Sequence, residues 1–199
     1  MTFYLNRSEC TRSPCGKLVF LRNLKCASTY HSFLLQKNGW TKQSASTIDW
    51  DKDYVFSFIM NPYVRHIKGL VEDLTWQGIE KPLVDLMSRQ FWLNLPWIGD
   101  HSMPMTLRIG DKVDKIDWIP IDIEGVSSQD LLNNLLAKFN ISIVWYGDIP
   151  KYESDPYKKE LYKKISFMSP YKDLLLREFT GDYKLYDSVV AKYKNDNTN

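Results

Sequence analysis

Apolar and polar positions divide the chain into short apolar runs of strand length and longer stretches with apolar residues at helical spacing. Strand-length runs stand at residues 19–21, 54–59 and 115–122. The first two runs each lead through a short polar turn into a segment of helical spacing. Such strand-turn-helix units in succession predict an α/β fold in which parallel strands bring both helix N-termini to the carboxyl edge of the sheet.

The remaining pattern predicts further helices around this unit. Residues 63–74 place Tyr63, Ile67, Leu70, Val71 and Leu74 on one buried face, and long amphipathic stretches follow at residues 77–95 and 128–139. Ser154-Asp155-Pro156 and Ser169-Pro170 each resemble a cap with proline at the first helical position, and a closing helix is expected within residues 171–186. We expect residues 1–16 to be irregular, with room for one edge strand at 2–5. Residues 42–47 are expected to form a loop and residues 192–199 a frayed end.

The composition is that of one soluble globular domain spanning residues 1–199. The chain has 199 residues, of which 44% are hydrophobic and 25% charged. Its 26 basic residues are nearly matched by 24 acidic ones, so the net charge of +2 does not favour general nucleic-acid binding. Any attraction for an anion must then come from a local cluster. The seven Trp and twelve Tyr residues fit either sugar-stacking surfaces or an aromatic core.

Three cysteines stand in the first 26 residues, at Cys10, Cys15 and Cys26. Cys10 and Cys15 are able to pair or to bind a metal, yet no further cysteine or nearby histidine completes a tetrahedral site. We interpret all three as free thiols in a reducing compartment. The N-terminus has no apolar stretch of the length that a signal peptide or membrane anchor requires. We therefore expect a cytoplasmic protein of bacterial or viral type, without a membrane partner.

The first turn is a candidate anion site. It reads Lys25-Cys26-Ala27-Ser28-Thr29 and leads into a helix whose first N–H groups have no partner within the helix. Lys25 adds a positive charge, and the hydroxyls of Ser28 and Thr29 add donors. In the competing interpretation Ser28 or Thr29 is an ordinary N-cap and Lys25 a solvated charge. The glycine-rich motif GxxxxGK[ST] is absent, which counts against an ordinary ATP- or GTP-binding loop.

Two other places carry candidate chemistry. Arg65 and Lys68, three residues apart, are expected to project together from the second helix, either towards a ligand or as a solvated basic face. His101 lies in a stretch kept irregular by Pro96, Gly99 and Pro104, and its ordinary pKa of about 6.5 suits a general base. The competing interpretation is a hydrogen-bonded loop histidine. His31 and His66 are packing residues or neighbours of a nucleotide.

These segments resemble those of sulfotransferases that use 3′-phosphoadenosine 5′-phosphosulfate (PAPS), most closely the Golgi-type carbohydrate branch. Residues 25–29 resemble the 5′-phosphosulfate loop, of the form K-x-A-C-T or K-x-G-T-T. Residues 56–70, FSFIMNPYVRHIKGL, resemble the 3′-phosphate segment F-x-x-V-R-[DN]-P-[FY]-x-R-L-x-S-[AG]. His101 and Pro104 match the H-W-x-P-Q stretch of chondroitin-type enzymes, although Ser102 stands here in place of the Trp and Met105 in place of the Gln. The resemblance covers roughly residues 17–187 through the order and spacing of several loose motifs.

Two departures fall in the 3′-phosphate segment. Met60 stands where the family has its first phosphate-binding arginine, and Lys68 stands where the family has a serine ligand. The first change removes a bidentate guanidinium, and the second adds a charge without that geometry. We therefore expect Lys68, with Arg65, to bind the 3′-phosphate. The alternatives are a different nucleotide or a chain that has lost activity.

The resemblance implies a P-loop-like three-layer α/β/α fold with a central, mainly parallel sheet. It implies transfer of a sulfuryl group from PAPS to a hydroxyl, expected to be that of a carbohydrate. Lys25 would stabilise the leaving oxygen, residues Cys26, Ala27, Ser28 and Thr29 would help hold the 5′-phosphate, and His101 would take the acceptor's proton. No metal or nucleic acid is required. The alternatives are a kinase-like phosphotransferase and a non-catalytic carbohydrate- or protein-binding module with a degenerate nucleotide site.

Overall fold

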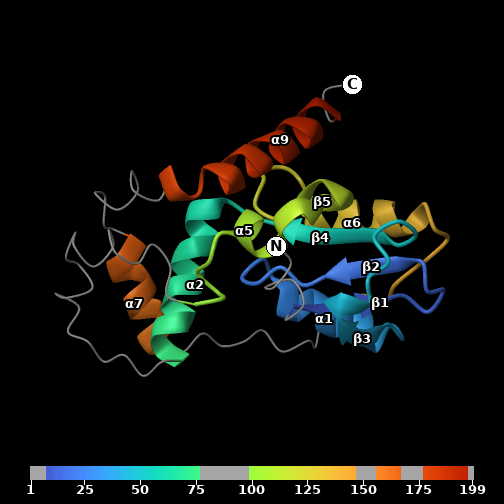
Figure 1. Cartoon of the computed structure of the whole chain (residues 1–199), viewed down its shortest axis with the longest axis horizontal. Helices are drawn as coiled ribbons and strands as arrows, with labels where there is room; N and C mark the ends of the chain where they lie inside the picture. The colour runs from blue at the N-terminus through green and yellow to red at the C-terminus, as the bar shows by residue number, and fades with distance from the viewer. Residues whose placement is uncertain (1–7, 77–98, 147–155, 167–176, 197–199) are drawn as a thin grey trace.

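The computed structural model describes residues 8–76, 99–146, 156–166 and 177–196, and within them five strands form an open sheet (Figure 1). The order across the sheet is β3-β1-β2-β4-β5. The strands are β1 (Glu9–Arg12), β2 (Leu18–Leu21), β3 (Thr41–Ser44), β4 (Tyr54–Ile59) and β5 (Ile116–Pro120). The expected edge strand at 2–5, the helix at 77–95 and the helix start at 169–170 lie outside the described residues.

The sheet is mixed. Strands β2, β4 and β5 run parallel, with Leu18 opposite Tyr54 and Ile59 opposite Pro120, whereas β1 is antiparallel to both β2 and β3. The α/β class and the parallel arrangement of the three apolar strands are confirmed. Because β1 is antiparallel to both of its neighbours, β3 runs in the same direction as β2, and β1 is the strand of this sheet that runs against the others. The added strands are short and polar, reading ECTR and TKQS, so hydrophobic periodicity could not reveal them. They form where irregular and loop structure was predicted for residues 1–16 and 42–47.

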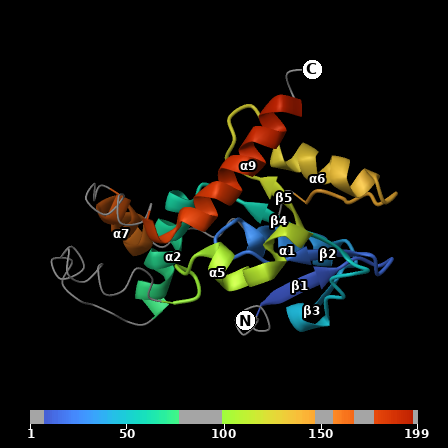
Figure 2. The ribbon, with the colours of Figure 1, turned by 45° about the horizontal axis from the view of Figure 1, so that its top comes forward.

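The helices follow the predicted order except for the short helix α5, which was not predicted. They are α1 (Ser28–Lys37), α2 (Pro62–Trp76), α5 (Met105–Ile109), α6 (Ser128–Ala137), α7 (Pro156–Ser166) and α9 (Thr180–Asp196), with 3-10 turns at Ala45–Thr47 and Gly110–Lys115. Helix α7 begins with Pro156 as predicted. Helix α9 continues to Asp196. The expectation of a frayed end is therefore wrong for residues 192–196. Both Figure 1 and Figure 2 show α7 beside α2 and α9 beside β5.

Apolar side chains pack on both faces of the sheet, because successive residues of a strand point to opposite sides. Leu18, Phe20, Phe56 and Phe58 face a cluster completed by Leu35 of α1 and by Leu132, Leu135 and Leu136 of α6. Val19, Leu21, Val55 and Ile59 face the other cluster, with Met105 and Ile109 of α5 and Val189 of α9. The three parallel strands are thus buried on both sides. The polar residues that follow β2 and β4 in the sequence stand at the carboxyl ends of these strands.

Asp182 fixes α5 against α9. Its carboxylate is fully buried and accepts hydrogen bonds from Met105 N at 2.7 Å, Thr106 N at 2.8 Å and Thr106 Oγ1 at 2.7 Å. A carboxylate at a helix N-terminus satisfies amides that have no partner within the helix. The position of α5, and of the residues on it, therefore depends on a contact that spans more than 70 residues of sequence.

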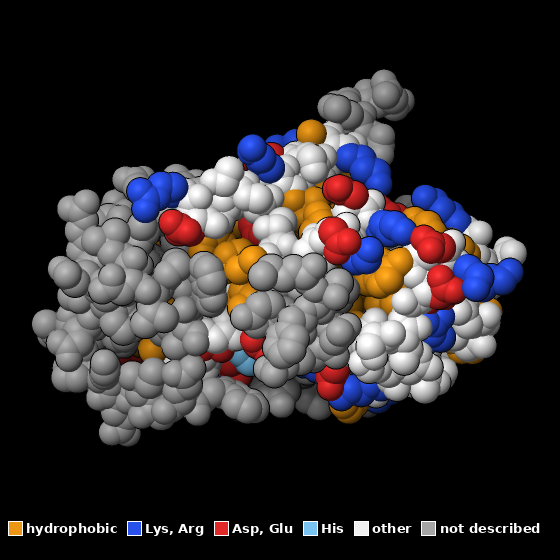
Figure 3. Space-filling model, in the orientation of Figure 1, with side chains coloured by type: hydrophobic (Ala, Val, Ile, Leu, Met, Phe, Trp, Pro, Cys, Tyr) orange, Lys and Arg blue, Asp and Glu red, His pale blue; other side chains and the backbone are white. Residues whose placement is uncertain are grey.

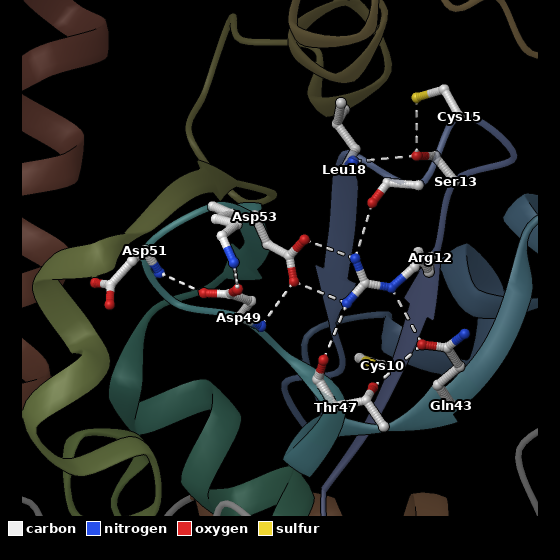
Figure 4. A network of polar contacts seen from close by, with 12 residues as sticks. Cys10, Arg12, Ser13, Cys15, Leu18, Gln43, Thr47, Asp49, Asp51 and Asp53 are labelled. Atoms are coloured by element: carbon white, nitrogen blue, oxygen red, sulfur yellow. Dashed lines mark hydrogen bonds and ion pairs between the residues drawn. The ribbon is translucent and has the colours of Figure 1, made fainter.

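A polar network joins the end of β1 to the residues before β4 (Figure 4). The Arg12 guanidinium donates to both carboxylate oxygens of Asp53, at 2.6 and 2.8 Å, and to the carbonyl oxygens of Gly16 and Thr47 at 2.8 and 3.2 Å. Only 18% of the Arg12 side chain and 8% of the Asp53 side chain are exposed. The pair therefore holds the antiparallel part of the sheet to the parallel part through charge-assisted bonds in a mostly dry place.

Replacing Arg12 by alanine should lower the free energy of unfolding by about 2–3 kcal/mol, because it leaves the largely buried Asp53 carboxylate without its partner. Hydrogen bonding to Arg12 holds the pKa of Asp53 below its ordinary value. This contribution is therefore present above the unfolded-state pKa of about 4 and is lost as the pH falls through the folded-state value. Urea unfolding at pH 7 and pH 3 measures both effects.

Lys52→Ala is the matched control, since Lys52 pairs with Asp49 at 3.0 Å on an exposed surface. It should leave the free energy of unfolding nearly unchanged, because an ion pair between solvated side chains contributes little. An equally small effect of Arg12→Ala would show that the network does not stabilise the sheet.

Candidate functional site

The turn between β2 and α1 has a strained backbone. Lys25 and Ala27 have φ values of 65° and 51°, in the left-handed region that non-glycine residues rarely adopt. Asn23 holds the turn in place: its Nδ2 donates to the carbonyl oxygen of Phe58 at 2.9 Å and to the Cys26 sulfur at 3.2 Å. Each left-handed residue costs about 1 kcal/mol, which the fixed surroundings offset.

The first turn of α1 presents open backbone donors. Ala27 is the N-cap residue and no side chain caps the helix. Within the described part of the chain, no hydrogen bond occupies the N–H groups of Ser28, Thr29 and Tyr30. Ser28 is buried, and exposed Thr29 accepts a hydrogen bond at its Oγ1 from Arg22 Nη2 at 3.0 Å. The interpretation of Ser28 or Thr29 as an ordinary cap is therefore wrong, and the first N–H groups of α1 are available to an anion.

Cys26 lies in the apolar cluster beneath the turn. Its side chain is fully buried, and burial raises the pKa of the thiol to about 11. The thiol stays protonated at neutral pH, so this residue supplies packing and its backbone to the turn. Cys10, Cys15 and Cys26 are all free thiols, as predicted.

The Lys25 ammonium group reaches helix α2. Its Nζ lies 3.0 Å from Glu72 Oε2, and Lys158 Nζ of α7 lies 3.0 Å from the same oxygen. Burial alone would raise the pKa of Glu72, but the two lysines outweigh it and lower the pKa to about 2. Lys68 is exposed one helical turn before Glu72, and so lies on the same side of α2. Two lysines thus share one carboxylate and keep a net positive charge, and Lys68 stands on the same side of α2.

Arg65 points into the protein. It is fully buried, and it donates from Nε to the carbonyl oxygen of Leu24 at 3.2 Å and from Nη1 to that of Met103 at 2.9 Å. Its Nη2 has no hydrogen-bond partner among the residues that the structure describes. The expectation that Arg65 and Lys68 project together is wrong, because the first side chain joins two loops and the second faces solvent. The sequence spacing could not reveal this, because the groups that bind Arg65 come from distant segments.

The N-terminus of α2 differs from that of α1 in being capped. Asn61 Oδ1 accepts from the N–H groups of Tyr63 at 3.0 Å and Val64 at 3.3 Å. Asp122, just after β5, accepts from Asn61 N at 2.7 Å. The first backbone amides of α2 are therefore already used, and any phosphate bound beside this helix must rely on side chains such as Lys68.

His101 forms a dyad with Asp73 of α2. The Nδ1 and Oδ1 atoms lie 2.9 Å apart, and the other Asp73 oxygen accepts from Ser102 N at 2.9 Å and Ser102 Oγ at 2.6 Å. Burial raises the pKa of Asp73, but the bonds from His101 and Ser102 outweigh it, so the pKa is lowered. An ionised carboxylate only accepts, so Nδ1 of His101 carries the proton and Nε2 the lone pair. With 27% of its side chain exposed, His101 has the tautomer and exposure of a general base.

Sequence reasoning missed Asp73 and Glu72. Both stand on α2 among ordinary polar positions, and their partners are 28 and 47 residues away. The other two histidines are packing residues: His31 stacks on Phe58 with ring centroids 3.7 Å apart, and His66 contacts Phe179. Burial lowers the pKa of each to about 4, so both are neutral at pH 7.

Gly69 lets the His101 loop lie directly on α2. A Cβ atom at this position would stand 1.9 Å from the carbonyl oxygen of His101 and 2.8 Å from Ser102 N. Close by, His66 Nδ1 lies 2.8 Å from the carbonyl oxygen of Ser102. The loop can therefore approach the helix this closely only because residue 69 has no side chain.

Gly69→Ala should lower the free energy of unfolding by about 1–3 kcal/mol, since backbone atoms of the loop must move away. The direction of this change in stability is decisive, because alanine stabilises a helix interior by about 1 kcal/mol relative to glycine where space allows. Thermal and urea unfolding measure the change. A stabilised variant would mean that the loop does not pack here as described.

The three predicted segments are thus in direct contact. Arg65 binds the turn at Leu24 and the loop at Met103, Lys25 reaches Glu72, and Asp73 holds His101. Two hollows, of about 400 and 230 Å³, lie elsewhere, the first lined by Asp122, Tyr186 and Lys194 and the second by Trp118, Leu185 and Lys192. Figure 3 shows charges of both signs intermixed over the described part of one face, without a field of one sign.

Comparisons with protein-family models, with curated proteins and with solved structures found no match. In the described residues, no three or more His, Cys, Asp or Glu side chains gather in a way that could hold a metal ion. No helix in the same residues has the length and apolar character needed to cross a bilayer.

Proposed function

We propose that this chain is a PAPS-dependent sulfotransferase that acts on a hydroxyl acceptor, with a carbohydrate as the expected class, and that its strands and helices follow the P-loop-like three-layer order of that family. The observation that carries the proposal is the contact of three segments distant in sequence. The turn at residues 25–29, helix α2 and the loop of His101 meet through Lys25, Arg65 and Asp73. The resemblance to the family relies on the same three segments.

The turn supports the 5′ end of the proposed site. Open amides at Ser28, Thr29 and Tyr30 and the charge of Lys25 fit a phosphate by geometry and by sign. During transfer, negative charge develops on the oxygen that bridges phosphate and sulfur. An ammonium group already held near that oxygen stabilises this charge more than it stabilises the ground state. Lys25 is the residue assigned this role.

The exposed side of α2 supports the 3′ end. Lys68 lies one turn from Glu72, and Glu72 pairs with Lys25. The cation expected at the 3′-phosphate and the cation expected at the 5′-phosphate are therefore both beside the same part of α2. Arg65 contributes differently from the family pattern, because its bonds to the carbonyl oxygens of Leu24 and Met103 join the two loops beside the site. A lysine supplies charge without bidentate geometry, so a looser grip on the 3′-phosphate is expected than the family's arginine gives.

The dyad supports the acceptor side. Nε2 of His101 accepts the proton of the attacking hydroxyl, while Asp73 holds the ring and stabilises the imidazolium that forms. The acceptor oxygen forms its bond to sulfur as the bond from sulfur to the 5′-phosphate oxygen breaks. The protein's task is to align these two partners and to stabilise charge.

Transfer of labelled sulfate from PAPS to a panel of glycans tests the proposal. A labelled glycan that forms only with active protein supports it. Labelled phosphate transferred from ATP would identify the chain as a phosphotransferase instead. If neither donor reacts while a glycan or protein still binds, the chain is a binding module.

A further inference from the structure

The buried polar atoms without a partner are not spread through the protein. Five such side-chain atoms occur in the described residues, and four of them belong to residues near the carboxyl end of β2. They are Arg22 Nε, Asn23 Oδ1, Arg65 Nη2 and Arg108 Nη1. Because buried polar groups are nearly always satisfied, a local group of exceptions indicates a partner outside the chain, which can be a water, an ion or a ligand.

Hydrogen bonds hold the three arginines to chain segments that lie next to one another. Arg108 Nε donates to Ser8 Oγ at 3.3 Å, and the neighbouring Glu9 accepts the backbone N–H of Arg22 at 3.0 Å. Arg65 binds the carbonyl oxygen of Leu24, two residues after Arg22, and that of Met103, in the turn before α5. Burial, and then the positive charges of Arg65 and Arg22, lower the pKa of Arg108 to about 10. The Arg108 guanidinium therefore stays protonated near neutral pH.

Their charge is poorly compensated. Arg65 is fully buried and Arg108 is 8% exposed, yet neither forms an ion pair with a carboxylate within the described residues; Asp100 and Asp73 act on Arg108 only from beyond ion-pair distance. Glu9 pairs with Arg22, but Lys42 shares it at 2.6 Å. Burying an unpaired charge is costly, and guanidinium groups match planar and tetrahedral oxyanions. Arg22 is partly exposed, so the cluster reaches the surface.

We propose that Arg22, Arg65 and Arg108 form a binding site for an oxyanion, a sulfate, phosphate or carboxylate group. Asn23 Oδ1 adds an acceptor for a hydroxyl group of the ligand or of a hydrogen phosphate. The site is distinct from the lysines around Glu72, since Arg22 and Arg108 take no part in that group. It does not depend on the proposed sulfotransferase function, although it would suit an acceptor that carries an anionic group.

Calorimetric titration with sodium sulfate, sodium phosphate and sodium acetate, each against sodium chloride at equal ionic strength, tests the site. At least one oxyanion should bind saturably, and which one does distinguishes sulfate, phosphate and carboxylate ligands. Arg108→Gln should weaken this binding at least tenfold, and Arg22→Gln, at a partly exposed position, should also weaken it. Lys158→Gln, in the lysine group, should leave it unchanged. Binding of no oxyanion beyond chloride, or equal binding by the arginine variants, would overturn the proposal.

A stability measurement separates ligand binding from mere packing. If Arg108 serves a ligand, Arg108→Met should keep or raise the melting temperature without anion, because an unpaired buried charge is removed. The same variant should lose the upward shift that the bound oxyanion gives the unaltered protein. A lowered melting temperature with the anion-dependent shift retained would assign Arg108 a structural role. Adenosine 3′,5′-bisphosphate binding, measured in parallel, reports on the proposed function independently.

Discussion

Lys25→Ala is expected to lower the rate of sulfate transfer by about 10²- to 10³-fold, the cost of removing one group that stabilises charge in a transition state. The side chain lies 3.0 Å from Glu72, in a turn whose backbone is held by Asn23, so its ammonium group is positioned before any ligand binds. Turnover with labelled PAPS at saturating acceptor measures the effect.

The chain offers a matched control. Lys158 makes the same 3.0 Å ion pair with Glu72 but stands on α7, outside the turn. Lys158→Ala removes an equivalent ion pair and should leave turnover within about twofold, while both variants should lose at most about 1 kcal/mol of stability. Equal rates for the Lys25 variant and the unaltered protein would remove Lys25 from the mechanism.

Asp73→Asn should lower kcat by about 10²- to 10⁴-fold by disturbing the tautomer of His101. The carboxylate accepts three hydrogen bonds, from His101 Nδ1 and from N and Oγ of Ser102. An amide can meet these donors with only one oxygen, so its NH₂ group must face either the histidine or the serine. If it faces His101, the proton moves to Nε2 and the base is lost.

Ser102→Ala serves as the control for this variant, because it removes one bond to Asp73 without changing the bond to His101. It should retain most of the activity. A double variant, Asp73→Asn with His101→Ala, should be no slower than His101→Ala alone, since residues that act as a unit are not additive. Independent losses in the double variant would mean that Asp73 does not act through His101.

The sequence predicted the elements whose residues carry their own signal. Apolar runs identified β2, β4 and β5, and the polar turn at Lys25 with its following helix appeared where expected. Hydrophobic pattern could not show β1 and β3, because pairing between backbones forms them and their residues are mostly polar. The predicted face of Arg65 was wrong for a related reason. The carbonyl groups of Leu24 and Met103 draw the side chain inward, and only the fold brings those groups to it.

The residues of the site also fall into those that the sequence could indicate and those that only the fold reveals. Lys25 and His101 could be selected from residue type and local context, whereas Glu72, Asp73 and Arg108 acquire their importance from partners far along the chain. Long-range contacts of this kind leave no periodic trace in a single sequence. The fold alone brings Arg22, Arg65 and Arg108 near one another, and their sequence positions share no pattern.

Calorimetric titration with adenosine 3′,5′-bisphosphate tests most directly whether the turn at Lys25 and helix α2 bind one nucleotide. The account predicts saturable binding that does not need Mg²⁺, weakened about tenfold or more in Lys25→Ala and in Lys68→Ala and unchanged in Lys158→Ala. Preference for ATP with Mg²⁺, the absence of any nucleotide binding, or unaltered affinity in both the Lys25 and the Lys68 variants would contradict it.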